Sequence, residues 1–150
     1  MAWTVGITVR TTTARPHLRG VALNEATDEA RTFQHKSSTG TAVEDQLHAL
    51  GQAFLTELTA QPVDAVWIRE AGYARGSGLT APTKTRLRAE GVCLAAARTV
   101  TQNVRIGDVN AATTALGNTK TAAQLDADGA ALTNADCAEA AGAALAARAM

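Results

Sequence analysis

Four acidic side chains stand in this sequence at places where an α/β protein commonly carries chemistry. Glu70 ends one apolar, strand-like stretch, Asp108 follows another, and Asp136 and Glu139 lie three residues apart in a helical segment near the C-terminus. Mg²⁺ prefers oxygen ligands, and a metal pair needs several carboxylates while it aligns water and phosphate. These acids therefore indicate metal-assisted chemistry at a phosphate group.

Residues 4–10 predict the central strand that must position these acids. Val5, Ile7 and Val9 alternate with small or polar residues, which is the period of a strand with one apolar face. Thr8 belongs to the opposite face, where a central strand often presents chemistry. The functional argument therefore depends on the residue at position 8.

Further strands are expected at residues 19–24, 30–36, 63–70 and 103–106. Short polar connections join the first three strands, including a turn over residues 11–16, so they predict an antiparallel meander. The strand at 63–70 returns through a helical crossover and is therefore expected beside the first strand and parallel to it.

The first helix is expected over residues 41–60, where Thr41 and Glu44 fit a capping box. One stripe of this helix is apolar and must cover the sheet: Val43, Leu47, Leu50, Phe54 and Leu58. A second helix is expected over residues 83–100. Three helical segments then begin near Asp108, Thr119 and Thr133, and the expected N-caps are Asp108, Asn118 or Thr119, and Thr133 with Asp136.

This order of elements describes an α/β, ribonuclease-H-like fold, with a five-stranded mixed sheet of three antiparallel and then two parallel strands, flanked by helices. With 150 residues, 46% of them hydrophobic, the chain can form one ordinary domain with a real core, so residues 1–150 are expected to be a single domain. Sites in such sheets form at the carboxyl ends of the parallel strands. Thr8, Glu70 and Asp108 are therefore expected near one another.

Composition limits the function classes. Lys plus Arg and Asp plus Glu number 14 each, so no global positive field attracts nucleic acid. Cys93 and Cys137 lie in Ala-rich helical contexts without metal-like spacing, which favours buried free thiols in a reducing cytoplasm. Neither a signal peptide nor an apolar stretch of about 18 residues occurs, so a cytoplasmic protein without membrane insertion is expected. P-loop, Rossmann and nucleophile-elbow sequences are also missing.

Charge is nevertheless uneven along the chain. Between positions 69 and 88, Glu70 is outnumbered by five basic residues: Arg69, Arg75, Lys84, Arg86 and Arg88. This segment is the most plausible phosphate-binding surface, and basic residues around the first hairpin can extend it: Arg10, Arg15, His17 and Arg19. The alternative is an ordinary solvated helix face beside a basic hairpin.

Several short motifs resemble those of the RuvC-type Holliday junction resolvases, and their order follows that family along nearly the whole chain. The motifs are Gly6-Ile7, Ile68-Arg69-Glu70 followed by Tyr73, Gly91 after Arg88-Ala89-Glu90, Gly117 with Lys120, and Asn134-Ala135-Asp136-Cys137-Ala138-Glu139-Ala140-Ala141. In that family, four acids bind Mg²⁺ for phosphodiester hydrolysis. The resemblance places Glu70, Asp136 and Glu139 at three of these positions, with Glu139 as a longer substitute.

The fourth position, an Asp in the family, is Thr8 in this chain. Threonine offers one neutral oxygen, so metal affinity and activation of the attacking water should both suffer. The resemblance therefore implies a degenerate nuclease site. Mg²⁺ is expected as a cofactor only if nuclease activity persists. Asp108 is either a replacement ligand at this site or the N-cap of the following helix.

The resemblance also implies branched DNA as a partner and a homodimer that matches a two-fold junction. An aromatic residue at the place of Tyr73 opens the junction in that family, and a mobile aromatic side chain can stack on an unpaired base. Nucleic-acid contacts are expected from Tyr73 and from five basic residues: Arg75, Lys84, Arg86, Arg88 and Lys120.

Each of these residues also has a purely structural interpretation. Glu70 is then a strand-end charge, Tyr73 a loop anchor, and Asp136 and Glu139 acids that favour the first turn of a helix. Three hypotheses follow. The first is a RuvC-like binding or scaffolding protein that has lost nuclease activity, the second an active Mg²⁺-dependent junction endonuclease, and the third a dimeric assembly protein.

Overall fold

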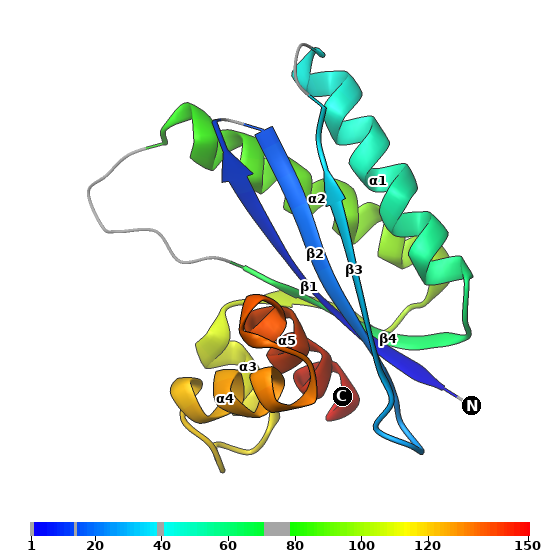
Figure 1. Ribbon diagram of the computed structural model, residues 1–150, viewed down its shortest axis with the longest axis vertical. Helices are drawn as coiled ribbons and strands as arrows, with labels where there is room; N and C mark the ends of the chain where they lie inside the picture. The colour runs from blue at the N-terminus through cyan, green and yellow to red at the C-terminus, as the bar shows by residue number, and fades with distance from the viewer. Residues whose placement is uncertain (1, 14, 39–40, 71–78) are drawn as a thin grey trace.

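A computed structural model describes residues 2–13, 15–38, 41–70 and 79–150. Its strands are β1 (Trp3–Thr12), β2 (Arg15–Asn24), β3 (Ala30–Lys36), β4 (Val63–Arg69) and β5 (Val104–Gly107). They form one sheet in the order β3-β2-β1-β4-β5 (Figure 1). β1 pairs antiparallel with β2 and parallel with β4, and β4 is parallel to β5, which confirms the predicted mixed sheet.

The first hairpin differs from the prediction, because Thr11 and Thr12 belong to β1 and Arg15 and Pro16 belong to β2. Thr11 pairs with Pro16 and Thr12 with Arg15, so β2 begins four residues earlier than expected. Thr13, directly after β1, has the left-handed φ of 52° that a tight turn requires. The proline suggested a turn, but β-branched threonines extend a strand well, and the ladder continues through this segment.

One face of the sheet is covered by α1 (Val43–Thr59) and α2 (Ala81–Val100) (Figure 1). Leu50, Phe54 and Leu58 of the predicted stripe are fully buried, and they share a core with the apolar residues of β1. The expected capping box is wrong: Ala42 is the N-cap of α1 and has no side-chain cap hydrogen bond. The hydroxyl of Thr41 instead donates to the Ser38 carbonyl.

The opposite face carries α3 (Val109–Ala115), α4 (Ala122–Leu132), the short 3₁₀ helix η1 (Ala135–Cys137) and α5 (Ala138–Arg148) (Figure 1). α5 lies against β1 at Gly6, where a Cβ atom would stand 2.1 Å from the amide nitrogen of Ala144. The Thr4 hydroxyl donates to the Ala144 carbonyl at 3.2 Å. Small residues on both elements therefore allow this helix to contact the backbone of the central strand.

The N-caps on this side match the prediction only at Asp108, whose side chain accepts a hydrogen bond from the amide of Ala111. Thr121, rather than Asn118 or Thr119, caps α4, because Gly117 and Asn118 both adopt left-handed backbone conformations in the preceding turn. Asn134, rather than Thr133, caps η1.

Both cysteines, Cys93 and Cys137, are free and buried, as the sequence predicts. Within the described ranges, no helix combines the length and apolar character needed to cross a membrane.

Candidate functional site

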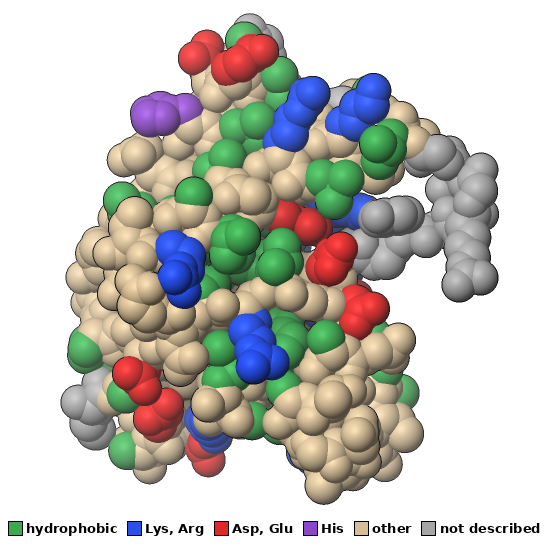
Figure 2. All heavy atoms as spheres, turned by 180° about the vertical axis from the view of Figure 1, so that it is seen from behind, with side chains coloured by type: hydrophobic (Ala, Val, Ile, Leu, Met, Phe, Trp, Pro, Cys, Tyr) green, Lys and Arg blue, Asp and Glu red, His purple; other side chains and the backbone are tan. Residues whose placement is uncertain are grey.

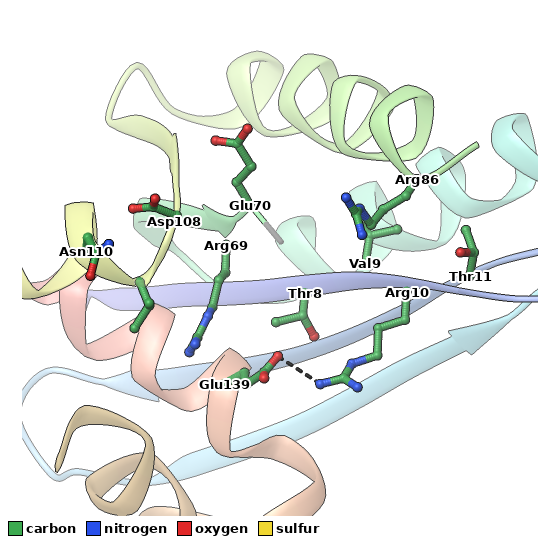
Figure 3. A pocket seen from close by; sticks show the side chains of 11 residues that line it. Thr8, Val9, Arg10, Thr11, Arg69, Glu70, Arg86, Asp108, Asn110 and Glu139 are labelled. Atoms are coloured by element: carbon green, nitrogen blue, oxygen red, sulfur yellow. Dashed lines mark hydrogen bonds and ion pairs between the residues drawn. The ribbon is translucent and has the colours of Figure 1, made fainter. Parts of the chain in front are cut away.

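The carboxyl ends of β1 and β4 and the residue after β5 open into one cavity of about 580 Å³, here called the central pocket (Figure 3). Thr8 comes from β1, Glu70 follows β4, Asp108 follows β5, and Glu139 comes from the first turn of α5. The parallel pairing of β1, β4 and β5 brings their ends together at this edge. The predicted proximity of Thr8, Glu70 and Asp108 is thus confirmed.

Thr8 lies at the floor of this pocket and is only 6% exposed. In the sheet register it stands between two arginines, opposite Arg19 of β2 and Arg69 of β4. A hydroxyl at this point neither neutralises those arginines nor offers a charged ligand to a metal. The centre of the pocket is therefore polar but without a carboxylate of its own.

The three acids that line the central pocket do not point to one place. Glu139 forms an ion pair of 2.9 Å with Arg10, and Asp108 accepts the helix-capping hydrogen bond described above. The Glu70 side chain points toward α2 and away from Glu139, while its backbone amide donates to the Gly107 carbonyl at 2.8 Å (Figure 3). Among the described residues, no three His, Cys, Asp or Glu side chains are grouped so that they could hold a metal ion.

Asp136 lies in a neighbouring cavity of about 560 Å³, here called the hairpin groove, which shares Thr8 and Arg10 with the central pocket. Its carboxylate is 3.9 Å from the guanidinium of Arg19, which also donates to the Asp136 backbone carbonyl at 2.8 Å. The chain forms η1 at this point, so Asp136 and Glu139 do not continue one α-helical face. The structure thus brings Glu70 and Glu139 to one pocket and Asp136 to the next.

Two arginines reach the central pocket with acidic partners of their own. Arg69 binds Asp126 of α4 at 2.5 Å, and its side chain is only 12% exposed. Arg86 of α2 lies 3.7 Å from Glu90, which is 2% exposed. Both pairs link the pocket to the packing of the surrounding helices.

The other predicted nucleic-acid contacts are dispersed. Lys84 and Arg88 are exposed and one turn apart on α2, and Figure 2 shows basic side chains over the first half of this helix. Lys120 is ion-paired with Asp128 of α4 and does not line either pocket. Tyr73 and Arg75 lie outside the described residues. α2 is thus the element that carries most of the predicted cations described.

Sequence reasoning missed Lys36, which lines the hairpin groove, and Asp126, which holds Arg69. Lys36 stands opposite His17 in the β2–β3 register, but the predicted second strand begins at Arg19 and so leaves His17 outside the sheet. Asp126 carries no local signal, because its partner lies 57 positions away.

His17 is the titratable group of the hairpin groove whose environment is most unusual. Its Nδ1 atom is buried and has no hydrogen-bond partner. Burial lowers the pKa of His17 below its ordinary value, and the positive charges of Arg15 and Lys36 and the ring of His35 lower it further.

Neither a protein-family model nor a curated protein matches the chain. Two solved structures of Thermus thermophilus RuvC are similar to it. RuvC in complex with a Holliday junction substrate has a TM-score of 0.67 and 20% identity, with 97% of this chain and 92% of that chain covered. A second RuvC structure has a TM-score of 0.63 and 18% identity, with 96% and 92% covered. The chain therefore has a RuvC-like, ribonuclease-H-like fold, as its motifs predict.

Proposed function

We propose that this protein, which has a RuvC-like fold, binds branched DNA and has lost the nuclease activity found in the RuvC-type resolvases. The observation that carries the proposal is Thr8, a buried neutral residue on the central strand, at the place where the resembling family has an aspartate. A two-metal phosphodiesterase needs several carboxylates directed at one point to bind its metals and align the attacking water.

The residues of the central pocket do not fit such a metal pair. Glu139 is bound to Arg10, and Asp108 caps α3. The third acid, Glu70, points toward α2 and away from Glu139 (Figure 3). Arginines line the same pocket, and their positive charge opposes cation binding. Magnesium-dependent hydrolysis is therefore not expected from this arrangement.

The same charges favour binding of a phosphodiester backbone. Arg10, Arg69 and Arg86 line the central pocket, and Lys84 and Arg88 add two exposed cations on the far side of α2 from Arg86, because residues two positions apart in a helix lie on nearly opposite faces. Phosphate contacts supply much of the affinity of DNA-binding proteins, and arginine suits them because it donates several hydrogen bonds. The solved RuvC with this fold is in complex with a Holliday junction, which supports branched DNA as the substrate class. We extend the proposal to a homodimer that matches the two-fold symmetry of such a junction.

The test compares labelled four-way junction, duplex and single-stranded DNA. Gel-shift binding is measured in EDTA, and cleavage is measured with Mg²⁺ or Mn²⁺. We expect preferential junction binding, two protomers per junction by analytical ultracentrifugation, and no cleavage. Binding should weaken steeply with salt, and the double variant with Lys84→Ala and Arg88→Ala should reduce the slope of log K against log salt by about 2.

An active endonuclease is the second candidate, because Asp108 does line the same pocket as Glu70 and Glu139. Metal-dependent cutting that Glu70→Gln abolishes would overturn the loss of activity and make Asp108 the leading replacement ligand. If the protein neither binds nor cuts any of these DNAs, the assembly hypothesis takes the place of both.

A further inference from the structure

The polar face of the sheet is open on one side of α5. α5 covers this face at Gly6, and η1 borders the uncovered part with Asp136. The hairpin groove lies on this open area, across β1, β2 and β3. Cations and neutral polar groups dominate its lining: Thr8, Arg10, His17, Arg19, Gln34 and Lys36.

Strand register aligns three of these side chains in one row, here called the basic row (Arg10, His17 and Lys36). His17 of β2 stands directly opposite Arg10 of β1 and directly opposite Lys36 of β3. Opposed residues in an antiparallel sheet project to the same face, and their Cα atoms are about 5 Å apart. The basic row therefore spans about 10 Å across the face of the sheet.

Acids only partly neutralise the groove. Asp136 is paired with Arg19, and Glu139 is paired with Arg10. Among described side chains, Lys36 and the adjacent Arg15 form no ion pair with a carboxylate. Arg10 and Lys36 lie on either side of His17, so a polyanion lying along the row would meet cations of both β1 and β3.

His17 sits at the centre of the basic row, and its buried Nδ1 has no hydrogen-bond partner. A phosphate oxygen that reached the groove would place negative charge between Arg10 and Lys36, beside the imidazole. Protonation makes both ring nitrogens donors and adds a positive charge. The imidazole is therefore placed to respond to an anion in this groove.

We propose that the basic row binds the phosphodiester backbone of a DNA arm and that His17 takes up a proton from solvent as the phosphate arrives. This inference rests on the proposed DNA-binding function and adds to it a second contact surface, on the sheet rather than on α2. It also makes the affinity for DNA depend on pH.

The direction in which DNA affinity changes with pH follows from the charges around His17. In the free protein, burial and the positive charges of Arg15 and Lys36 hold the pKa of His17 below 6.5, and His35 acts in the same direction. Arg10 faces the ring from β1, and Asp136, paired with Arg19, borders the groove from η1. A bound phosphate raises the pKa of His17, because opposite charge favours the protonated form. Affinity should therefore rise as pH falls through the bound-state pKa and level off below the free-state pKa.

The experiment measures the dissociation constant of the 150-residue chain for a four-way junction in EDTA, between about pH 5.5 and 8 and at several salt concentrations. His17→Gln removes the titration, and Lys36→Ala removes one cation of the row. Arg105→Ala on the opposite edge strand β5 is the charge-matched control, and His48→Gln on α1 is the control for histidine loss; both control residues are exposed. NMR titration of the histidine rings of the wild-type protein, with and without DNA, gives a readout that needs no variant.

We expect wild-type affinity to rise several-fold toward pH 5.5, and His17→Gln to lose most of this rise while His48→Gln keeps it. Lys36→Ala should reduce the slope of log K against log salt by about 1, whereas Arg105→Ala leaves it unchanged. DNA should raise the NMR-measured pKa of His17. If the wild type binds the junction but His17→Gln, Lys36→Ala and the His17 titration show no such effects, the basic row is not a contact surface and the proposed function stands alone. If the wild type binds no DNA, the proposed function and this inference both fail.

Discussion

Arg10 of β1 and Glu139 of α5 form an ion pair of 2.9 Å at the point where the central pocket and the hairpin groove meet (Figure 3). The pair joins residues 129 positions apart, and it occupies the carboxylate that the family resemblance assigns to a metal. In this structure, Glu139 is therefore the counter-charge of Arg10.

Replacing Glu139 by Gln should strengthen DNA binding. The change removes one negative charge and frees Arg10, so we expect a several-fold lower dissociation constant at moderate salt. Stability should change by less than about 1 kcal/mol, because both partners of the pair are substantially exposed. Gel shift and urea unfolding measure the two effects. Weaker DNA binding, or loss of a metal-dependent cleavage, would show that Glu139 acts as a ligand after all.

Replacing Thr8 by Asp should raise the affinity for Mg²⁺ or Mn²⁺. The new carboxylate would enter the pocket that Glu70, Asp108 and Glu139 already line. At a metal concentration ten times the dissociation constant, we expect the variant to gain about 1.4 kcal/mol of unfolding free energy. Isothermal titration calorimetry and thermal unfolding with and without metal measure this.

Thr8→Asn is the matched control for that variant, because it has nearly the same shape as Asp and no charge. It should not respond to metal. A Thr8→Asp variant that binds no more metal than Thr8→Asn would mean that the acids of the central pocket cannot converge even when a fourth is supplied.

Replacing Gly6 by Ala should destabilise the protein by about 3 kcal/mol or more, because the added methyl group meets helix backbone rather than a flexible side chain. The new Cβ would lie 2.1 Å from the Ala144 nitrogen and 2.2 Å from the Ala140 oxygen. Gly91→Ala is the control: its Cβ meets nothing within 4 Å, and it lies exposed in α2. That change should stabilise by about 0.5–1 kcal/mol. Equal effects of the two substitutions in urea unfolding would contradict the packing of α5 on β1.

Cys93 should be unreactive toward thiol reagents in the folded protein. It should also lower the free energy of unfolding at high pH. Burial, with a smaller contribution from Glu90, raises the pKa of this thiol from 9.0 to about 12. The contribution of Cys93 to stability is thus complete below pH 9 and is lost as pH rises toward 12. In a Cys137→Ser background, thiol labelling at pH 8 should proceed only at the rate of unfolding. Cys93→Ala should show a flatter loss of stability between pH 9 and 12; fast labelling of native Cys93 would contradict its burial.

Most of the order of strands and helices could be predicted from the sequence, because the alternation of apolar and polar residues in strands and the helical periodicity are local patterns. β3 matches its predicted limits, and Leu50, Phe54 and Leu58 of the predicted stripe lie on the buried face of α1. The strand residues around Pro16 and the caps of α1, α4 and η1 could not be predicted, because these depend on pairing and on competing hydrogen bonds.

The sequence by itself determined that four acidic positions and Thr8 would stand at the strand ends and near the last helix, since the order of elements places them there. Only the tertiary structure decided their partners. Glu139 meets Arg10, Asp136 meets Arg19, and Lys36 aligns with His17 because register and helix packing join residues that are distant along the chain. Charge and residue type are local properties, whereas the distance between two charges belongs to the fold, and that distance decides whether an acid binds a metal or neutralises an arginine.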